Sequence, residues 1–385
     1  MQAARSEADP DPARLLEDLG LGAVAAWKER TGRKAVGHFP VYAPLELIHA
    51  QGALPVSLFG GWGQVEIDHA DSRLQSFVCS ITKSTLELGL TGRLKVLDGM
   101  LFTNICDVAR NLSGVWTRNF PGSMTEFLHM PQNVESPSAR AHLASELRRL
   151  SASLERLTGM AYDPAALTES IALYNRGRAL LRRLETVREE RPWALPASDW
   201  YLLLRTGTVV PVEEHVRRLE GAVEAAEASP VRPRDGVRVL LIGSFCEQPP
   251  LGLVRQIEEA GCLVVEDDLV LGQRWYTAPV PEEGDPMEAL VSAYLGSSKP
   301  SAVRHHGAHP RQHHLVERAK ALDLDGVLFC SAKFCEPALY DYVLQKDALE
   351  AAGIPYLHVE YEEKMSAFEQ PRTQVETFVE SILFD

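Results

Sequence analysis

Short apolar runs alternate with amphipathic segments in the first third of the chain and again in its last part. In the first third, the apolar runs predict strands at 35–37, 54–58 and 96–102. The amphipathic segments around them predict helices at 11–30, 44–50, 74–88 and from 107 to about 120. Strands that alternate with helices indicate a parallel sheet covered by helices.

The middle of the chain follows a different pattern. Residues 138–228 are rich in Ala, Leu, Arg and Glu at helical spacing, with no convincing strand among them. A segment with two prolines, 229–233, ends this stretch and is typical of a linker. The middle therefore predicts a helical domain.

After the linker the alternation resumes. Strands are expected at 237–243, 262–265, 327–329 and 356–359, and helices at 251–260, 286–295, 313–322, 336–352 and 374–383. The predicted fold class is α/β, with two doubly wound parallel-sheet domains of the Rossmann or flavodoxin type and an intervening helical domain. The expected boundaries are 1–130, 131–232 and 233–385.

Composition and charge narrow the class of partner. The 385 residues are 45% hydrophobic and 24% charged, with a formal net charge of −14, which disfavours nucleic acid or an anionic membrane as partner. No apolar run approaches the roughly 18 residues of a membrane span, and the first residues do not resemble a signal peptide. We therefore expect a cytoplasmic protein.

The stretch 326–346 contains the most informative cysteine. An apolar strand at 327–329 is followed by a short polar loop, and Glu336-Pro337 predicts the start of a helix because proline is favoured at the first helical position. Cys335 thus lies between the carboxyl end of a strand and a helix N-terminus. Ligands of open α/β sheets bind at such positions, and the helix dipole favours an anionic group such as a thiolate.

Five further cysteines offer partners for Cys335. Six cysteines are too few and too scattered for a disulfide framework, and no CxxC pair supports a zinc site. Cys106 and Cys246 also follow predicted strands and precede helices, whereas Cys79 is expected on a helix. Cys262 and Cys330 are expected to pack as small hydrophobic residues. Position alone leaves a metal role open for the remaining four, as ligands of an iron–sulfur cluster.

Five segments carry a resemblance to a known family. They are GHFPVYAPLELIHAQGALPV, VCSITKSTLELGL, DGMLFTNICDVARNLSGVW, FCEQPPLGLVRQIEEAGC and FCSAKFCEPALYDYVLQKDALEAAGIPYLHVEY. In this order, between residues 35 and 361, they resemble the 2-hydroxyacyl-CoA dehydratase superfamily. Within it they are most similar to the branch formed by the C subunits of ATP-dependent (class I) benzoyl-CoA reductases.

The resemblance implies one 4Fe–4S cluster per chain, held by three cysteines. Carried over residue by residue, the iron ligands are Cys79, Cys106 and Cys335. Cys106 is followed by the acidic residue of the family motif, and Glu336 replaces the aspartate common after the third cysteine. Cys246 matches a position that is not a ligand in the family. Glu46 matches a segment that lines the acyl-CoA pocket and is the candidate catalytic residue, although a carboxylate on a helix surface is the simpler interpretation.

The resemblance also implies a reaction and partners. The expected reaction is the ferredoxin-driven, two-electron dearomatisation of an aromatic acyl-CoA to a cyclic dienoyl-CoA in anaerobic aromatic degradation. The expected partners are a homologous cluster-bearing subunit, ATP-hydrolysing activator subunits, ferredoxin and the acyl-CoA substrate. No GxxxxGK[ST] motif occurs, so no nucleotide site is expected in this chain. The alternatives are a subunit of a 2-hydroxyacyl-CoA dehydratase, which is a lyase, and a non-catalytic structural partner.

One basic segment remains outside these motifs. RHHGAHPRQHH is interpreted as an exposed loop before a helix, because Pro310 interrupts any helical spacing of its histidines. Its Arg304 and Arg311 offer contacts for CoA phosphates, with a solvated loop as the default interpretation.

Overall fold

The first sheet follows the expected alternation. A computed structural model describes residues 18–272, 274, 278–297, 301, 303–305, 307 and 310–384. Its first four strands are parallel and have the order β2-β1-β3-β4, with bounds Lys34–His38 (β1), Ala53–Ser57 (β2), Gly99–Thr103 (β3) and Met124–Leu128 (β4). The helices among them are α2 (Leu21–Thr31), α3 (Leu45–Ala50), α4 (Asp68–Asp71), α5 (Ser80–Leu90) and α6 (Asp107–Asn119). The first part of the helix predicted at 11–30 lies outside the described residues.

The second sheet repeats this topology. Four parallel strands have the order β6-β5-β7-β8, with bounds Val237–Gly243 (β5), Cys262–Asp268 (β6), Gly326–Ala332 (β7) and Tyr356–Tyr361 (β8). Its helices are α11 (Leu251–Glu259), α13 (Arg311–Ala321), α14 (Glu336–Ala352) and α15 (Glu369–Phe384). In both sheets the first strand lies between the second and third, which confirms the α/β class with two similar parallel sheets.

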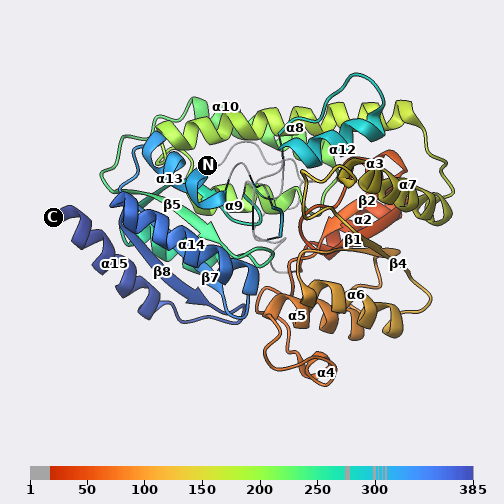
Figure 1. The fold of residues 1–385 in the computed structure, drawn as a ribbon, viewed down its shortest axis with the longest axis horizontal. Coiled ribbons are helices and arrows are strands. Elements are labelled where there is room, and N and C mark those ends of the chain that lie inside the picture. The colour runs from red at the N-terminus through yellow and green to blue at the C-terminus, as the bar shows by residue number, and fades with distance from the viewer. Residues whose placement is uncertain are drawn as a thin grey trace.

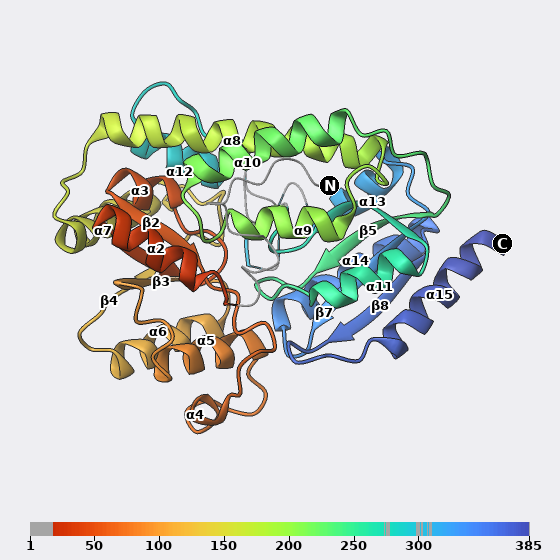
Figure 2. The same ribbon diagram turned by 180° about the vertical axis from the view of Figure 1, so that it is seen from behind.

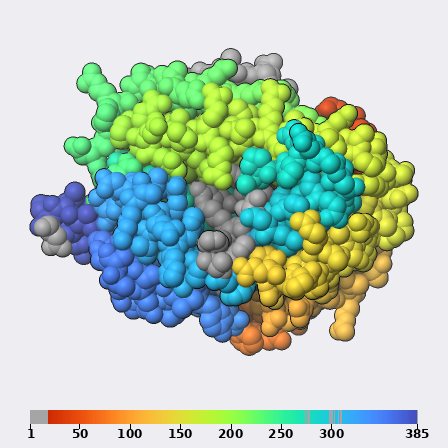
Figure 3. Space-filling model, turned by 45° about the horizontal axis from the view of Figure 1, so that its top comes forward, coloured from red at the N-terminus to blue at the C-terminus, as the bar shows by residue number. Residues whose placement is uncertain are grey.

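Helices bridge the two sheets. The middle of the chain forms α7 (Ala139–Thr158), α8 (Pro164–Glu190), α9 (Ala197–Thr206) and α10 (Val212–Glu227). The long helix α8 packs on α3 beside the first sheet and on β6 of the second, and α10 packs along it. Figures 1 and 2 show α8 and α10 lying across both sheets, and Figure 3 shows their surface spanning the molecule from above. None of the described helices is long and apolar enough to span a membrane.

The hydrophobic core is shared between segments far apart in sequence. α12 (Pro286–Ser297) follows the second sheet's β6 in sequence but packs on α7 and α8. Leu290 and Val291 of α12 belong to a buried cluster that also contains Val36 of β1 and Leu47 of α3. The two sheets are therefore joined by the bridging helices and also by α12, with which the chain returns from the second sheet to the side of the first.

Some details differ from the predictions. β4 was not predicted because its MTEFL sequence forms a half-buried edge strand with no clear apolar alternation. α9 was also missed. The helix predicted at 74–88 begins only at Ser80, because Cys79 has extended backbone angles (φ −60°, ψ 150°). Of the apolar residues just before it, Val78 is buried but Phe77 is 65% exposed.

A buried histidine makes the stability of the fold depend on pH. His38 of β1 is 3% exposed, and its Nε2 lies 2.8 Å from Ser57 Oγ on β2. Burial lowers the pKa of His38 from 6.5 to about 4. The unfolded chain thus binds a proton near pH 6.5 that the folded chain rejects until about pH 4, so stability is lost as pH falls through this window, by up to roughly 3 kcal/mol from this residue.

We predict that His38→Gln reduces this acid loss of stability by about 2–3 kcal/mol between pH 7.5 and 4.5, because glutamine does not titrate there. Urea unfolding at the two pH values measures the effect. His142→Gln is the matched control, since His142 is exposed. An acid loss in His38→Gln as large as in the unsubstituted protein would show that His38 is not buried in its neutral form.

Candidate functional site

Each of the three predicted cysteine ligands is the N-cap residue of a helix. Cys79 precedes α5, Cys106 precedes α6 and Cys335 precedes α14. Cys106 and Cys335 also follow the carboxyl ends of β3 and β7, one in each sheet. A helix N-terminus carries roughly half a positive charge, so all three sulfur atoms occupy positions that favour a thiolate.

The three thiols lie near one another. Burial is the main cause of the raised pKa of the Cys79 thiol. The charges of Glu247, Cys106 and Cys335 raise it further. Burial likewise raises the pKa of Cys106 to about 11, with a smaller increase from Cys335. Such mutual influence requires proximity, and Figures 1 and 2 both place the segment before α5 beside the loop between β7 and α14. The fold thus brings together the three residues that the resemblance implied.

Backbone and hydroxyl groups surround the sulfur atoms. The Ala109 N–H donates to Cys106 Sγ at 3.4 Å, and Cys79 Sγ lies 3.2 Å from Thr82 Oγ1. Burial raises the pKa of the Cys335 thiol, and hydrogen bonds from the backbone of Phe245 and Ala338 oppose this increase. Hydrogen bonds to sulfur are among the features that set the reduction potential of an iron–sulfur cluster.

Two loops near the thiols contain backbone strain. Phe334, directly before Cys335, has φ 66°, and the consecutive residues Val41 and Tyr42 have φ 73° and 62°. Positive φ is rare outside glycine and is a genuine outlier for a β-branched residue such as valine. Strain of this kind persists where the surroundings hold a residue in place and clusters at functional sites. The strained residues lie directly before Cys335 in the loop after β7 and at Val41 and Tyr42 in the loop after β1.

The thiols fit a multi-iron group better than a single ion. Among the described residues, no three His, Cys, Asp or Glu side chains lie close enough to hold one metal ion. A 4Fe–4S cluster binds each thiolate through a different iron atom, so its ligands do not converge on one point. Buried thiols at helix N-termini with amide donors are suitable ligands for such a group, which would deprotonate them on binding.

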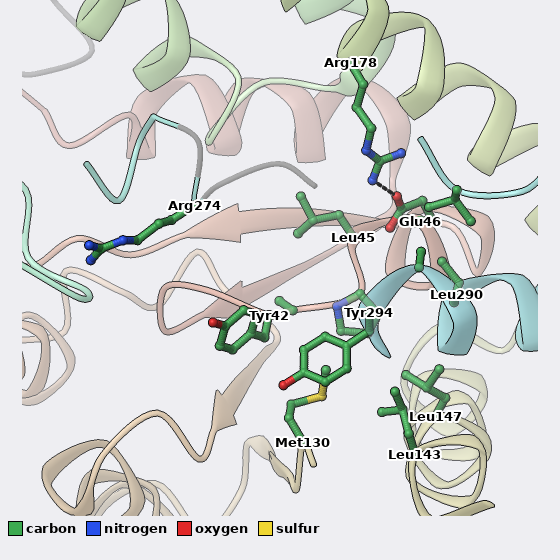
Figure 4. A pocket seen from close by; sticks show the side chains of 14 residues that line it. Tyr42, Leu45, Glu46, Met130, Leu143, Leu147, Arg178, Arg274, Leu290 and Tyr294 are labelled. Carbon is green, nitrogen blue, oxygen red and sulfur yellow. Dashed lines mark hydrogen bonds and ion pairs between the residues drawn. The ribbon is translucent and has the colours of Figure 1, made fainter. Parts of the chain in front are cut away.

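A pocket lies near the thiols. It encloses about 90 Å³ and is lined by Tyr42, Glu46, Arg178, Arg274 and Tyr294, together with apolar side chains of α7 and α12. Figure 4 shows Glu46 and Arg178 pointing toward each other on one side, with the two tyrosines together below them. Largely apolar walls with a few polar groups are typical of small-molecule sites.

Glu46 is buried in this pocket and does not lie on a helix surface. It is 4% exposed and forms an ion pair with Arg178, which also donates to Asn175 Oδ1 at 3.0 Å. The Glu46 carbonyl accepts from Ser170 Oγ at 2.9 Å. The simpler interpretation of Glu46 as a surface carboxylate is therefore wrong, and its predicted catalytic role stays a prediction.

An aromatic contact joins the pocket to the thiols. Tyr42, in the pocket wall, has its ring centroid 6.1 Å from that of Phe245, which donates its backbone N–H to Cys335 Sγ. Arg274 stacks over the Phe245 ring at 5.3 Å and donates to the Ser244 carbonyl at 2.7 Å. Phe245 thus connects Tyr42 and Arg274 of the pocket wall to Cys335.

The prediction of a solvated loop for two arginines is wrong. Arg304 is fully buried and donates to the carbonyls of Tyr294 and Leu295. Arg311 forms ion pairs with the carboxylates of Asp268 and Asp341. Both guanidinium groups therefore serve internal contacts, and no local pattern indicated their partners because these lie in other elements.

Sequence reasoning also missed a buried carboxyl group. Glu247 is 3% exposed, and its Oε2 accepts from the Ile81 N–H at 3.3 Å. Burial raises the pKa of Glu247 to about 8, with a further increase from the charge of Glu363. The only available signal was its position next to Cys246 after a strand.

Comparison with known proteins places the chain in a class. The family described as 2-hydroxyglutaryl-CoA dehydratase, D-component, matches residues 40–382. The chain belongs to this family of 2-hydroxyacyl-CoA dehydratases, which confirms the resemblance.

Particular relatives cover nearly the whole chain. The C subunit of benzoyl-CoA reductase from Thauera aromatica is 39% identical over 370 residues, which are 96% of each chain. The beta subunit of lactoyl-CoA dehydratase from Anaerotignum propionicum is 30% identical over 92% of this chain and 94% of its own. The (R)-phenyllactyl-CoA dehydratase beta subunit of Clostridium sporogenes is 28% identical over 92% and 93%. All three are subunits of enzymes, and this chain is an enzyme subunit as well.

We predict that Arg178→Met destabilises the protein by about 3–5 kcal/mol, because it leaves the buried Glu46 carboxylate without its partner. The double variant Glu46→Gln/Arg178→Met should recover most of this loss. Arg183→Met is the control: its pair with Glu227 is exposed and should be worth less than about 1 kcal/mol. Urea unfolding measures all three. Equal losses for Arg178→Met and Arg183→Met would mean that the Glu46 pair is not buried in solution.

Proposed function

We propose that this chain is the iron–sulfur subunit of an ATP-dependent aromatic acyl-CoA reductase that acts on benzoyl-CoA in the cytoplasm. The single observation that supports this most is the 39% identity to the C subunit of a benzoyl-CoA reductase over 96% of both chains. The dehydratase subunits are less similar, at 28–30%. The gathered thiols of Cys79, Cys106 and Cys335 are the proposed ligands of one 4Fe–4S cluster.

When bound, such a cluster supplies electrons one at a time at low potential. The chain's own residues would provide the surroundings. The N-termini of α5, α6 and α14 favour negative charge at the sulfur atoms, and amide donors such as Ala109 N–H stabilise it. Cys79 and Cys335 are buried and Cys106 is partly buried, which limits the access of water and protects a reactive radical from side reactions.

The pocket beside the thiols would position the acyl group. Its apolar side chains from α7 and α12 suit an aromatic ring, and Glu46 with Arg178 provides the polar end. Glu46 is the candidate for holding or delivering a proton after an electron has reached the ring. The ring contact between Tyr42 and Phe245 connects the pocket to the loop that bonds Cys335.

The proposal includes partners. The chain would assemble with a homologous cluster-bearing subunit, and reduced ferredoxin would supply electrons through separate ATP-hydrolysing activator subunits. The sequence contains no P-loop, which supports ATP hydrolysis by another subunit.

The assay that tests the function uses the complex purified anaerobically with its co-expressed neighbouring subunits. With benzoyl-CoA, reduced ferredoxin and ATP, we expect cyclic dienoyl-CoA formation coupled to stoichiometric ATP hydrolysis. A 2-hydroxyacyl-CoA is the comparison substrate, because dehydratase subunits are relatives too. Dehydration of that substrate without reduction of benzoyl-CoA would replace this proposal with the lyase.

We predict that Cys335→Ala removes most of the iron from this chain, which should otherwise hold about four iron atoms. Cys330→Ala is the matched control, because Cys330 lies five residues earlier, inside β7, and is fully buried in the core. Iron analysis and the visible absorption of the anaerobic complex provide the measurement. Equal iron contents in the two variants would favour the non-catalytic interpretation, in which the cysteines only pack.

A further inference from the structure

The helix that follows Cys335 has its polar and apolar faces exchanged. On α14 the buried residues are Asp341, Gln345 and Leu349, four residues apart, and two of these three are polar. The large residues that α14 exposes are apolar: Leu339, Tyr340, Val343 and Leu344. A surface helix of a soluble protein normally buries its apolar residues and exposes its polar ones. The outer side of α14 therefore has the composition of a surface that another protein covers.

The polar inner side of α14 attaches the helix to its own chain. Asp341 forms an ion pair with Arg311 of α13, and α14 packs on α13 and β7. Figure 1 shows α14 in front of the second sheet, with its other side facing the viewer. The exposed apolar side chains are therefore not the ones that hold α14 in place within this chain.

Two exposed phenylalanines lie in the loops that carry proposed cluster ligands. Phe334 directly precedes Cys335, has φ 66° and is 42% exposed, with Lys333 Nζ 5.5 Å from its ring centroid. Phe77, 65% exposed, lies two residues before Cys79. Figures 1 and 2 place the segment before α5 beside the loop between β7 and α14. We call the two phenylalanines and the four exposed residues of α14 the apolar face.

The apolar face has the composition of an interface centre. The residues of α14 between 339 and 344 include one charged side chain, Asp341, and it is buried. Charged residues occur on either side in sequence, with Lys333 and Glu336 before the face and Lys346 and Asp347 after it. Protein interfaces commonly have such an aromatic and apolar centre, depleted of charge, within a polar rim.

The area of the apolar face favours a permanent partner over a transient one. Its six side chains expose apolar surface on the order of 600 Å². Since interfaces are roughly 60% apolar, a protein that covers the face would bury roughly 1,000 Å² on this chain. Stable complexes bury about 800 Å² on each partner, whereas weak electron-transfer contacts bury less than about 600 Å². Among the proposed partners, the permanent one is the homologous subunit.

We propose that the apolar face binds the homologous cluster-bearing subunit. This inference rests on the proposed function for that partner and for the cluster. Because Phe334 and Phe77 lie within two residues of Cys335 and Cys79, the bound subunit would lie beside the proposed cluster. One electron could then cross this contact, so that the cluster of one subunit is oxidised and that of the other is reduced.

The test uses the co-expressed complex, purified anaerobically through an affinity tag on this chain. In Leu344→Glu a charge without a partner enters the face, and we expect binding of the homologous subunit to weaken by about 30-fold or more. Leu383→Glu is the matched control, because Leu383 is a similarly exposed leucine on α15 (62%, against 54% for Leu344) and lies outside the face. It should leave binding unchanged. The ratio of homologous subunit to tagged chain over a dilution series measures binding.

A photo-crosslinking amino acid at position 344 covers the case in which Leu344→Glu does not fold. We expect crosslinks from position 344 to the homologous subunit, identified by mass spectrometry, and none from position 383. Binding as tight in Leu344→Glu as in the unsubstituted complex would overturn the inference. Crosslinks from position 344 to an activator subunit, to ferredoxin or to a second copy of this chain would overturn it as well.

The proposed reaction and this inference fail in different ways. Neither binding nor crosslinking uses a substrate, so a complex that does not reduce benzoyl-CoA would overturn the proposed reaction and leave the assignment of the apolar face in place. If no homologous subunit is recovered with the unsubstituted chain, the proposed partner and this inference are both overturned.

Discussion

Burying several thiols where two parallel sheets meet is the constraint on which the rest of the structure depends. A buried thiolate is costly unless nearby dipoles or cations stabilise it. Three helix N-termini provide that stabilisation, because Cys79, Cys106 and Cys335 each cap a helix. Since Cys106 and Cys335 follow strands of different sheets, the carboxyl ends of both sheets must lie together. The shared strand order of the two sheets and the long helix α8 that packs beside both are consistent with this requirement.

The energetic cost of the site is offset elsewhere in the fold. Positive φ at Val41, Tyr42 and Phe334 stores strain in two loops of the site, of order 1–3 kcal/mol for each residue. Buried ion pairs and packed aromatic rings hold these loops in place. Arg274, for example, joins Asp268 to the loop of Phe245, whose ring also contacts Tyr42. These contacts hold the strained loops from several sides.

The alternation of apolar and amphipathic segments was sufficient to predict the fold class, because strand and helix periods are local properties of the sequence. It also predicted that Cys106 and Cys335 lie between strands and helices. It failed for Cys79, since an extended residue before a helix and a residue inside it differ little in pattern. The burial of Glu46 depends on Arg178, 132 residues away in sequence. Such pairings depend on tertiary structure, so no local pattern in the sequence could reveal them.

The proposed iron–sulfur cluster would lie between the carboxyl ends of the two sheets, bound by cysteines of both. Diffraction from crystals of the anaerobic complex, measured on both sides of the iron absorption edge, tests this placement directly. We predict anomalous iron density enclosed by Cys79, Cys106 and Cys335 of this chain. Iron-free electron density between these residues, with their sulfur atoms packed against protein groups, would contradict it.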